Sequence, residues 1–411
     1  MGQSLGKLNN LSPEVRQYMI VTGNYWAFTL TDGALRMLVV LHFHQLGYSP
    51  LQIAMLFLFY EFFGVVTNLV GGWLGARLGL NKTMNIGLFL QIVALGMLLV
   101  PTALLTVPLV MSAQAISGIA KDLNKMSAKS AIKNLVSKNE EGKLYRWVAL
   151  LTGSKNTLKG VGFFMGGLLL ALFGFQGAIL LMALMLLAVW IISLMKLKQD
   201  LGRSKAKPKF SQTFSKSAAI NYLSAARMFL FGARDVWFVV ALPVYLSSQM
   251  NWSHTFVGSF LALWIIGYGV IQTLAPKITG SKTGNVPTGS TAFSWALVLA
   301  VIPALIASAL YFNVSPQIAL LGGLLLFGVI FAINSSLHSF LIVHMATDDG
   351  VSLDVGFYYM ANAMGRLIGT VLSGWVYQAH DLEMCLLVSA VFVIIAAILS
   401  LLIPKPDSVQ A

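Results

Sequence analysis

Apolar stretches of about 20 residues recur along almost the whole chain, and no other feature constrains its fold as strongly. A helix of that length crosses the hydrocarbon layer of a bilayer. Hydrophobic residues make up 57% of the 411 residues and charged residues only 10%, against about 25% charged residues in ordinary soluble domains. A mean hydropathy of +0.79 implies more apolar surface than one globular core can bury. The sequence therefore predicts an all-α integral membrane protein.

Hydropathy windows of about 19 residues indicate twelve transmembrane helices. They lie near residues 18–46, 51–76, 83–101, 106–136, 143–173, 176–195, 217–247, 254–275, 289–311, 317–345, 353–378 and 383–403. Charged residues interrupt the fourth, fifth and seventh of these. The residues before the first helix are too polar for the hydrophobic region of a signal peptide, so we expect the first helix to remain in the mature protein.

The basic residues of the loops set the expected orientation. Alternate loops contain no Lys or Arg, whereas the loops between them carry Arg77, Lys82, Lys133, Lys138, Lys143, Lys277 and Lys282. Lys and Arg are enriched in cytoplasmic loops, so this pattern predicts that both termini are cytoplasmic. The acidic loop 347–354 departs from the pattern, but acidic residues contribute little to this bias.

A polar segment, residues 196–216, divides the chain into an N-terminal half (1–195) and a C-terminal half (217–411) of six helices each. It contains seven basic residues and one Asp, which is typical of a cytoplasmic linker held at an anionic membrane surface. We expect no role in nucleic-acid binding. Two six-helix halves joined by a basic linker resemble the major facilitator fold, in which the halves rock about a site near the bilayer midplane.

The loop between the second and third helices, GGWLGARLGLNK, resembles the gating loop of that superfamily. Gly72, Arg77, Gly79 and Lys82 match its pattern, but Ala76 occupies the position of its Asp. The resemblance therefore supports the fold and weakens any inference about the usual charged latch.

Lysines recur every fourth residue in the fourth helix, within GIAKDLNKMSAKSAIK (118–133). A four-residue step rotates a helix by only about 40° beyond a full turn, so Lys121, Lys125 and Lys129 share one face, which we expect to line a cavity. Lys133 lies at the end of this stripe, where a lysine can extend to the membrane interface.

Further cations lie at membrane depth. They are Arg36 in the first helix, Lys155 and Lys159 in the fifth, Arg227 and Arg234 in the seventh, and Arg366 in the eleventh. The carboxylates at similar depth are Asp32, Glu61, Asp122 and Asp235. We expect Asp32 to pair with Arg36, and Asp122 or Asp235 to pair with a neighbouring helix.

Even with all four carboxylates paired, about five cations remain unmatched. Uncompensated charge in hydrocarbon is costly, and arginine and lysine bind oxyanions well. This excess predicts a substrate site for a multivalent anion. A set of interhelical salt bridges with some lysines extending to the interface is the alternative reading.

The sequence contains no motif for covalent chemistry or for nucleotide binding, so we expect no enzyme, no cofactor and transport driven by gradients. Cys385 is the only cysteine, which excludes an intrachain disulfide and a multi-thiolate metal site. The histidines, including His42, His44 and His344, are more typical of packing than of a metal site, and His338 is a candidate for lining the cavity.

Two stretches resemble one branch of the superfamily, the ArsJ-like organoarsenical exporters. They are TDGALRMLVVLHFH (31–44) and FYEFFG (59–64) with the residues that follow, and GIAKDLNKMSAKSAIK and FGARDVWFVVALPVYL are similar to the same branch. The resemblance implies export of 1-arseno-3-phosphoglycerate across a bacterial inner membrane, with a glyceraldehyde-3-phosphate dehydrogenase as functional partner. We expect a monomer in the lipid bilayer. The drive would be the membrane potential or proton antiport, with Asp32, Asp235 and above all Glu61 as candidate proton carriers. A transporter of another phosphorylated or organic anion is the alternative.

Overall fold

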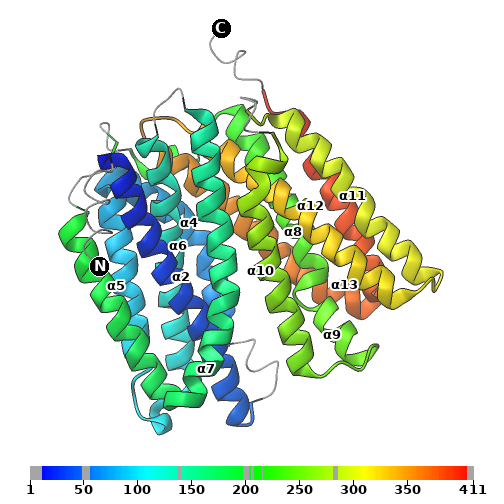
Figure 1. Ribbon diagram of the computed structural model, residues 1–411, viewed down its shortest axis with the longest axis horizontal. Coiled ribbons are helices and arrows are strands. Elements are labelled where there is room, and N and C mark those ends of the chain that lie inside the picture. Colours follow the sequence, from blue (N-terminus) through cyan, green and yellow to red (C-terminus); the bar gives the residue numbers. More distant parts are fainter. Residues whose placement is uncertain are drawn as a thin grey trace, which may run out of the picture. The chain divides into compact units, whose positions relative to one another are not determined.

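The computed structural model describes residues 12–48, 56–136, 140–197, 203–204, 208–214, 216–280 and 286–404 (Figure 1). The side chain of His44, the residue Lys138 and much of the predicted linker lie outside this part of the chain. All regular secondary structure in the described residues is helical, as the sequence predicts.

The described residues of the first half of the chain form five α-helices and a short 3₁₀ helix. They are α2 (Pro13–Gln45), α4 (Leu58–Leu78), α5 (Leu80–Met97), η1 (Thr102–Leu104), α6 (Val107–Leu135) and α7 (Glu141–Lys196). Gly79 alone separates α4 from α5, and its φ of 97° lies in the left-handed region that glycine enters without steric cost.

The second half begins after a 3₁₀ helix in the linker, η2 (Phe210–Thr213). Its α-helices are α8 (Ala218–Phe238), α9 (Ala241–Ser248), α10 (His254–Ile278), α11 (Gly289–Tyr311), α12 (Pro316–Met345) and α13 (Val351–Leu401). Ser217 caps α8 by accepting a hydrogen bond from the Ile220 amide, and Ser253 caps α10 in the same way. Such caps satisfy amides that have no partner inside the helix.

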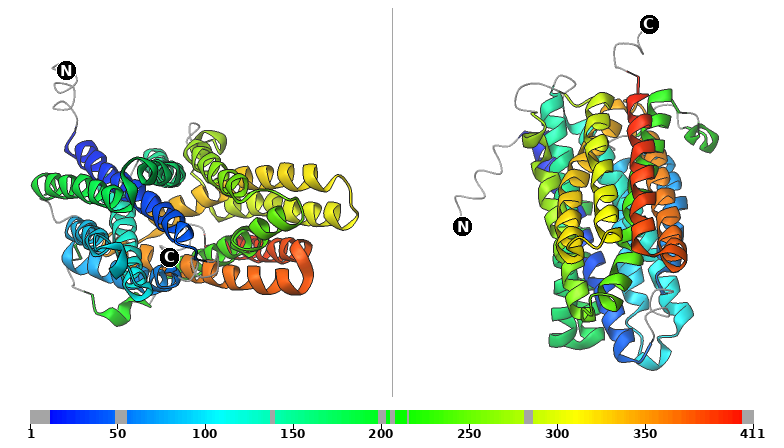
Figure 2. Two further views of the ribbon diagram at one scale, coloured as in Figure 1. Left: turned by 90° about the horizontal axis from the view of Figure 1, so that it is seen from below. Right: turned by 90° about the vertical axis from the view of Figure 1, so that its right-hand side faces the viewer.

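The two longest helices each contain a reversal, so that each supplies two of the twelve membrane crossings. In α7 the reversal is at Gly174, with φ 66°, and in α13 it is at Asp381, with φ 67°. The bend within α13 is visible between its orange and red parts in Figure 2. Both positions fall between predicted spans. Glycine and aspartate are among the residues that tolerate the left-handed backbone of these reversals.

The helices of the described residues account for all twelve predicted spans. The described parts of α2, α4, α5, α6 and α10 to α12 give one crossing each, α8 and α9 together give the seventh, and α7 and α13 give two each. The second predicted span begins at residue 51, and residues 49–55 lie outside the described part of the chain.

The described residues fall into two compact units. Unit 1 comprises Met1–Trp147, Leu158–Thr213 and Ala346–Gly356, and unit 2 comprises Val148–Thr157, Phe214–Met345 and Phe357–Ala411. The units change near residue 213, within the predicted linker. Two short segments depart from this division. Residues 148–157 of the first half belong to unit 2, and residues 346–356 of the second half belong to unit 1.

Unit 1 is held together by close backbone approach. A Cβ atom on Gly33 of α2 would lie 2.8 Å from the carbonyl oxygen of Lys159 in α7, and one on Gly162 would lie 2.8 Å from the carbonyl oxygen of Leu30. Small residues let membrane helices pack with their backbones in contact. α6 packs against α4, α5 and α2, which places its lysine stripe inside this unit.

Unit 2 has an aromatic core. Trp237 of α8 packs edge-on against Trp264 of α10 and Phe327 of α12. The indole of Trp264 donates a hydrogen bond to the Leu324 carbonyl at 2.9 Å, as a buried indole requires. These contacts fix α8, and with it the arginines that this helix carries.

Candidate functional site

The cations of unit 1 begin with a cluster between α2 and α4. Arg36 forms an ion pair with Glu61 at 3.0 Å. Asp32 accepts hydrogen bonds from the Tyr60 hydroxyl, at 2.7 Å to one carboxylate oxygen and 2.9 Å to the other. The prediction that Asp32 pairs with Arg36 is therefore wrong for the hydrogen bonds. Arg36 bonds to Glu61, and Asp32 bonds to Tyr60. α4 supplies both partners, because Tyr60 and Glu61 are neighbours in the chain and each reaches one of the two charged residues on α2.

Tyr60 also joins this cluster to the lysines of α6. The ammonium nitrogen of Lys121 lies 3.8 Å from the centroid of the Tyr60 ring, a cation–π contact. A Cβ atom on Gly118 would lie 2.7 Å from the Tyr60 carbonyl oxygen, so α6 approaches α4 closely here. The hydrogen bonds to Asp32 thus orient the ring on which Lys121 rests.

Asp122 is the carboxylate that the lysine stripe carries within its own helix. It lies 2.6 Å from the ammonium of Lys125 and 4.0 Å from that of Lys121, and its side chain is only 1% exposed. Two lysines therefore share one buried carboxylate. Asp122 pairs within α6, whereas the sequence left open a partner on another helix.

The remaining lysines of unit 1 are spread over α6 and α7. Lys129 is 3% exposed, deeper in the protein than Lys121 and Lys125. Lys133 donates to the backbone carbonyl of Ala346 and lies 3.8 Å from Asp348. It therefore contacts the acidic loop that departs from the loop-charge pattern. Lys159 lies one turn before Phe163, with its ammonium 6.0 Å from the ring.

Unit 2 contains a buried arginine with neutral hydrogen-bond partners. Arg227 of α8 is 3% exposed, donates from Nε to the Asn362 side-chain oxygen at 2.9 Å, and donates from a terminal nitrogen to the Ser335 carbonyl at 3.1 Å. Its guanidinium lies 3.8 Å from the Phe231 ring centroid. Among the described residues, no carboxylate forms an ion pair with it.

Arg234 and Arg366 share one carboxylate. Asp235 of α8 is fully buried and forms ion pairs with Arg234, its neighbour in the chain, and with Arg366 of α13, the latter at 3.0 Å. The predicted pairing of Asp235 with a neighbouring helix is confirmed. Among the residues predicted at membrane depth, three arginines thus accompany one aspartate in this unit, so the cationic excess is present here as well.

Lys155 and Lys159 belong to different units, although one helical turn separates them. Lys155 lies in the segment 148–157, which clusters with unit 2. The next residue, Asn156, donates to Gln272 of α10 at 2.5 Å. The chain therefore passes from unit 2 back to unit 1 within a single turn of α7, a change that the spacing of the two lysines could not indicate.

The predicted gating loop lies at the end of α4, and Gly72 in this loop packs against α13. A Cβ atom on Gly72 would lie 2.5 Å from the Ser352 carbonyl oxygen and 3.1 Å from the Cα of Gly356. The Ser352 hydroxyl in turn donates to the Gly72 carbonyl at 2.8 Å. Arg77 is exposed and stacks over Trp73.

The alanine that replaces the usual Asp of this loop receives a contact from the linker. The amide of Ser204 donates to the Ala76 carbonyl at 2.8 Å. Close by, the Trp73 indole donates to the Pro208 carbonyl at 3.0 Å, while Lys82 is exposed in the first turn of α5. Backbone contacts thus hold the loop where the superfamily pattern has a charged residue.

We expect Gly72→Val to lower transport activity about tenfold or more. A branched side chain cannot occupy the contact between α4 and α13, and overpacking of this kind typically costs about 1 to 3 kcal/mol. Transport per molecule of membrane-inserted protein measures the effect. Gly96→Ala in α5 is the control, because a Cβ atom there meets nothing within 4 Å and alanine favours the helix. Equal activity of the two variants would show that the contact at Gly72 is not needed.

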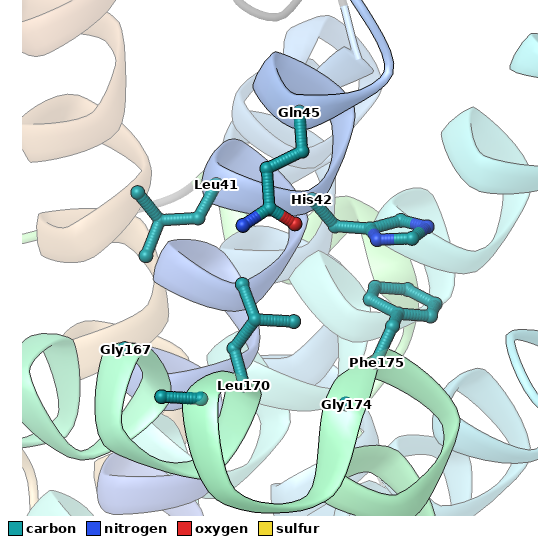
Figure 3. Close-up of a pocket in the computed structure, with 8 residues that line it drawn as sticks. Leu41, His42, Gln45, Gly167, Leu170, Gly174 and Phe175 are labelled. Atoms are coloured by element: carbon teal, nitrogen blue, oxygen red, sulfur yellow. The ribbon is translucent and has the colours of Figure 1, made fainter.

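A cavity of about 490 Å³ lies in unit 1 between α2 and α7, apart from the cationic clusters. Figure 3 shows Leu41, His42 and Gln45 of α2 facing Leu170 and Phe175 of α7 across it. Its lining carries no Lys, Arg, Asp or Glu, so it does not suit a polyanion. His42 stacks on Phe175 at 4.1 Å, which agrees with the prediction of a packing role.

Sequence reasoning missed several residues of these clusters because their side chains are neutral. Tyr60, Ser335, Ser352 and Asn362 carry no charge, and nothing in their spacing marks them. The adjacency of Tyr60 to Glu61 was the one usable signal, since neighbouring residues on a helix can bond to two residues one turn apart on the next helix.

The comparisons with known proteins identify the family. A sequence model described as Major Facilitator Superfamily matches residues 21–293 and 223–411. No curated protein matches the chain. The chain therefore belongs to the major facilitator superfamily. It is a multi-pass membrane protein, and its class transports small solutes.

Solved structures agree on the fold. The chain is similar to the E. coli fucose:proton symporter FucP, with a TM-score of 0.73 and 12% identity over 95% of this chain and 99% of that one. It is similar to a bacterial homologue of the iron transporter ferroportin, with a TM-score of 0.71 and 16% identity over 93% and 98%. The human organic anion transporter MFSD10 gives a TM-score of 0.76 and 16% identity over 95% and 100%. At these identities the likeness concerns the fold alone.

Proposed function

We propose that this chain exports a small organoarsenical polyanion, 1-arseno-3-phosphoglycerate, from the cytoplasm and so confers resistance to arsenate. Transport would proceed by alternating access, the mechanism of the superfamily fold. The substrate carries a phosphate and an arsenate ester, so its recognition is oxyanion chemistry, in which arginine forks and lysine point charges bind the oxygens.

The observation that carries this proposal is that cations outnumber carboxylates in both units among the residues predicted to lie at membrane depth. Among these residues, five cations accompany three carboxylates in unit 1: Arg36, Lys121, Lys125, Lys129 and Lys159 with Asp32, Glu61 and Asp122. Four cations of the same set accompany Asp235 in unit 2: Lys155, Arg227, Arg234 and Arg366. We propose that these nine cations bind the anionic groups of the substrate.

The choice of an organoarsenical among polyanions rests on the sequence resemblance to the ArsJ-like exporters. The resemblance includes FYEFFG (59–64), which contains both Tyr60 and Glu61, and GIAKDLNKMSAKSAIK (118–133) with the lysine stripe. The motifs that carry the resemblance are thus the ones that carry the contacts of the unit 1 cluster. A transporter of another phosphorylated or organic anion is the second candidate, because the cations do not distinguish phosphorus from arsenic.

The membrane potential is a sufficient driving force for such export. An inside-negative potential contributes about 2.3 kcal/mol per charge per 100 mV, so a substrate leaving with about three negative charges gains about 7 kcal/mol at 100 mV. Proton antiport is the alternative. Of its candidate carriers, Glu61 is paired with Arg36, and Asp235 is shared by two arginines, so protonating either one would release a cation.

We further propose a bacterial inner membrane location with both termini cytoplasmic. The loop-charge pattern supports the orientation, and the resemblance supports the membrane and the partnership with a glyceraldehyde-3-phosphate dehydrogenase. That enzyme forms the arseno-ester when it uses arsenate in place of phosphate. The partnership is one of substrate supply and requires no contact between the two proteins.

We expect arsenate resistance in a sensitive bacterial strain that produces both this chain and a glyceraldehyde-3-phosphate dehydrogenase. Survival on arsenate and the arsenic retained by the cells are the two measurements. With both proteins present, survival should rise and retained arsenic should fall, because the ester leaves the cell and releases arsenate outside. The dehydrogenase alone is the matched control.

If the transporter gives resistance without added dehydrogenase, the experiment is repeated in a host strain that lacks its own dehydrogenase, which separates ester export from arsenate export. If that strain stayed resistant, the substrate would be arsenate itself. If the membrane-inserted protein gave no resistance in any arm, the second candidate, another phosphorylated or organic anion, would replace the first.

A further inference from the structure

Arg227 is the cation of unit 2 whose contacts within the protein leave most of its hydrogen-bonding capacity unused. A guanidinium has five N–H donors and no acceptor. Among the described residues, the donors of Arg227 reach two acceptors, the Asn362 side chain and the Ser335 carbonyl. Arg234 and Arg366 differ, because both are paired with the carboxylate of Asp235.

Two helix faces that pack on Arg227 carry further buried polar atoms. On α12, Ser335, His338 and Ser339 are spaced three and four residues apart and so share one face. On α13, Tyr358 and Asn362 are four residues apart and share another. In the described part of the chain, Nδ1 of His338 is buried without a hydrogen-bond partner, and the buried hydroxyls of Tyr358 and Ser339 have no partner other than each other.

Tyr358 and His338 are neighbours of a charge with which no described carboxylate forms an ion pair. The guanidinium of Arg227 lies 3.8 Å from the Phe231 centroid and 5.3 Å from the Tyr358 centroid. The rings moderate its charge but accept none of its remaining in-plane N–H groups. Buried polar groups are normally hydrogen-bonded, and each exception calls for an explanation.

Resting on the proposed function, we propose that Arg227 and the hydroxyl groups of Tyr358 and Ser339 form a buried site for one tetrahedral oxyanion group of the phosphate or arsenate class. A guanidinium binds such a group through parallel N–H donors, and two hydroxyl groups supply further donors. The group belongs to the transported substrate or to free inorganic anion. Asn362 and Ser335 position the guanidinium, and the three other cations of unit 2 are not part of this site.

The test measures anion binding to the purified full-length protein in detergent. Inorganic phosphate and 3-phosphoglycerate are titrated by calorimetry at constant ionic strength, with chloride as the background anion. The variants are Arg227→Gln, Tyr358→Phe and Ser339→Ala. Lys277→Gln, an exposed cation at the end of α10, and Tyr311→Phe, an exposed tyrosine, are the matched controls.

We expect both probes to bind the unaltered protein. Arg227→Gln should abolish phosphate binding, and Tyr358→Phe should weaken it about tenfold, the effect of losing one hydrogen bond to a charged group. The tyrosine variant keeps the test decisive if the arginine variant fails to fold. Its hydroxyl has no protein partner in the described residues other than the Ser339 hydroxyl, so a purely structural role predicts unchanged anion binding.

Unchanged phosphate affinity in Tyr358→Phe and Ser339→Ala would overturn the site, as would phosphate binding that survives Arg227→Gln or a protein that binds neither probe. Competition between 3-phosphoglycerate and phosphate assigns the site to a substrate group, and lack of competition assigns it to free anion. Arg227-dependent phosphate binding without dehydrogenase-dependent arsenate resistance would refute the proposed function and leave this site standing. Dehydrogenase-dependent arsenate resistance together with phosphate binding that does not depend on Arg227 would refute this site and leave the proposed function standing.

Discussion

Asp235→Asn should destabilise the folded protein by about 3 to 5 kcal/mol, the usual cost of removing one partner from a buried ion pair. The substitution keeps the volume of the side chain but removes the negative charge that lies between two cations. Asp235 is fully buried, and Arg366 lies 3.0 Å from its carboxylate. Without that charge, Arg366 and Arg234 are left close together in a medium that screens them poorly.

Thermal unfolding of the detergent-solubilised protein, followed by loss of the monodisperse species, measures this effect. Arg366→Gln is the informative comparison, because Asp235 keeps its ion pair with Arg234 and the loss should be smaller. The double variant Asp235→Asn, Arg366→Gln should recover part of the stability, because it removes one of the two positive charges that repel each other. Additive losses in the double variant would contradict the coupling, since residues in direct contact normally deviate from additivity by about 0.5 to 3 kcal/mol.

Hydropathy predicted the twelve crossings well because the bilayer imposes a fixed length on each helix. The predicted breaks near residues 174 and 381 match the reversals within α7 and α13. The predicted start of the helix that contains Tyr60 falls in residues outside the described part of the chain. Helix ends depend on local backbone geometry such as that of Gly79, which hydropathy does not report.

The partners of the charged residues were harder to predict than their presence. Spacing within one helix favoured Asp32 as the partner of Arg36, but α4 supplies Glu61, and Tyr60 takes the Asp32 carboxylate. The predicted spans give an approximate depth for each residue, but they do not show which residues of a second helix face Arg36. Lys155 and Lys159 illustrate the same limit, because one turn of a helix separates residues of two different units.

Lys121→Gln should reduce export of the arseno-ester about tenfold or more while the protein still folds and inserts. Lys121 is one of the proposed substrate ligands, and a hydrogen bond to a charged group contributes about 1.5 to 3 kcal/mol. Its structural contacts are modest. The Tyr60 ring loses a cation–π contact of about 0.5 to 2 kcal/mol, whereas Asp122 keeps Lys125 at 2.6 Å.

Lys143→Gln is a control matched in chemistry. Lys143 also pairs with a carboxylate, Glu140 at 2.9 Å, and also lies over an aromatic ring, that of Trp147 at 5.3 Å, but it lies at the start of α7, outside the lysine stripe. Retained arsenic in cells that also produce the dehydrogenase, normalised to protein in the membrane, measures export by both variants. Equal export by the two would remove Lys121 from the substrate site. A loss confined to Lys121→Gln, with similar melting temperatures for both proteins, would place the effect in substrate binding, because the variants lose the same kinds of contact and differ in where the lost charge lies.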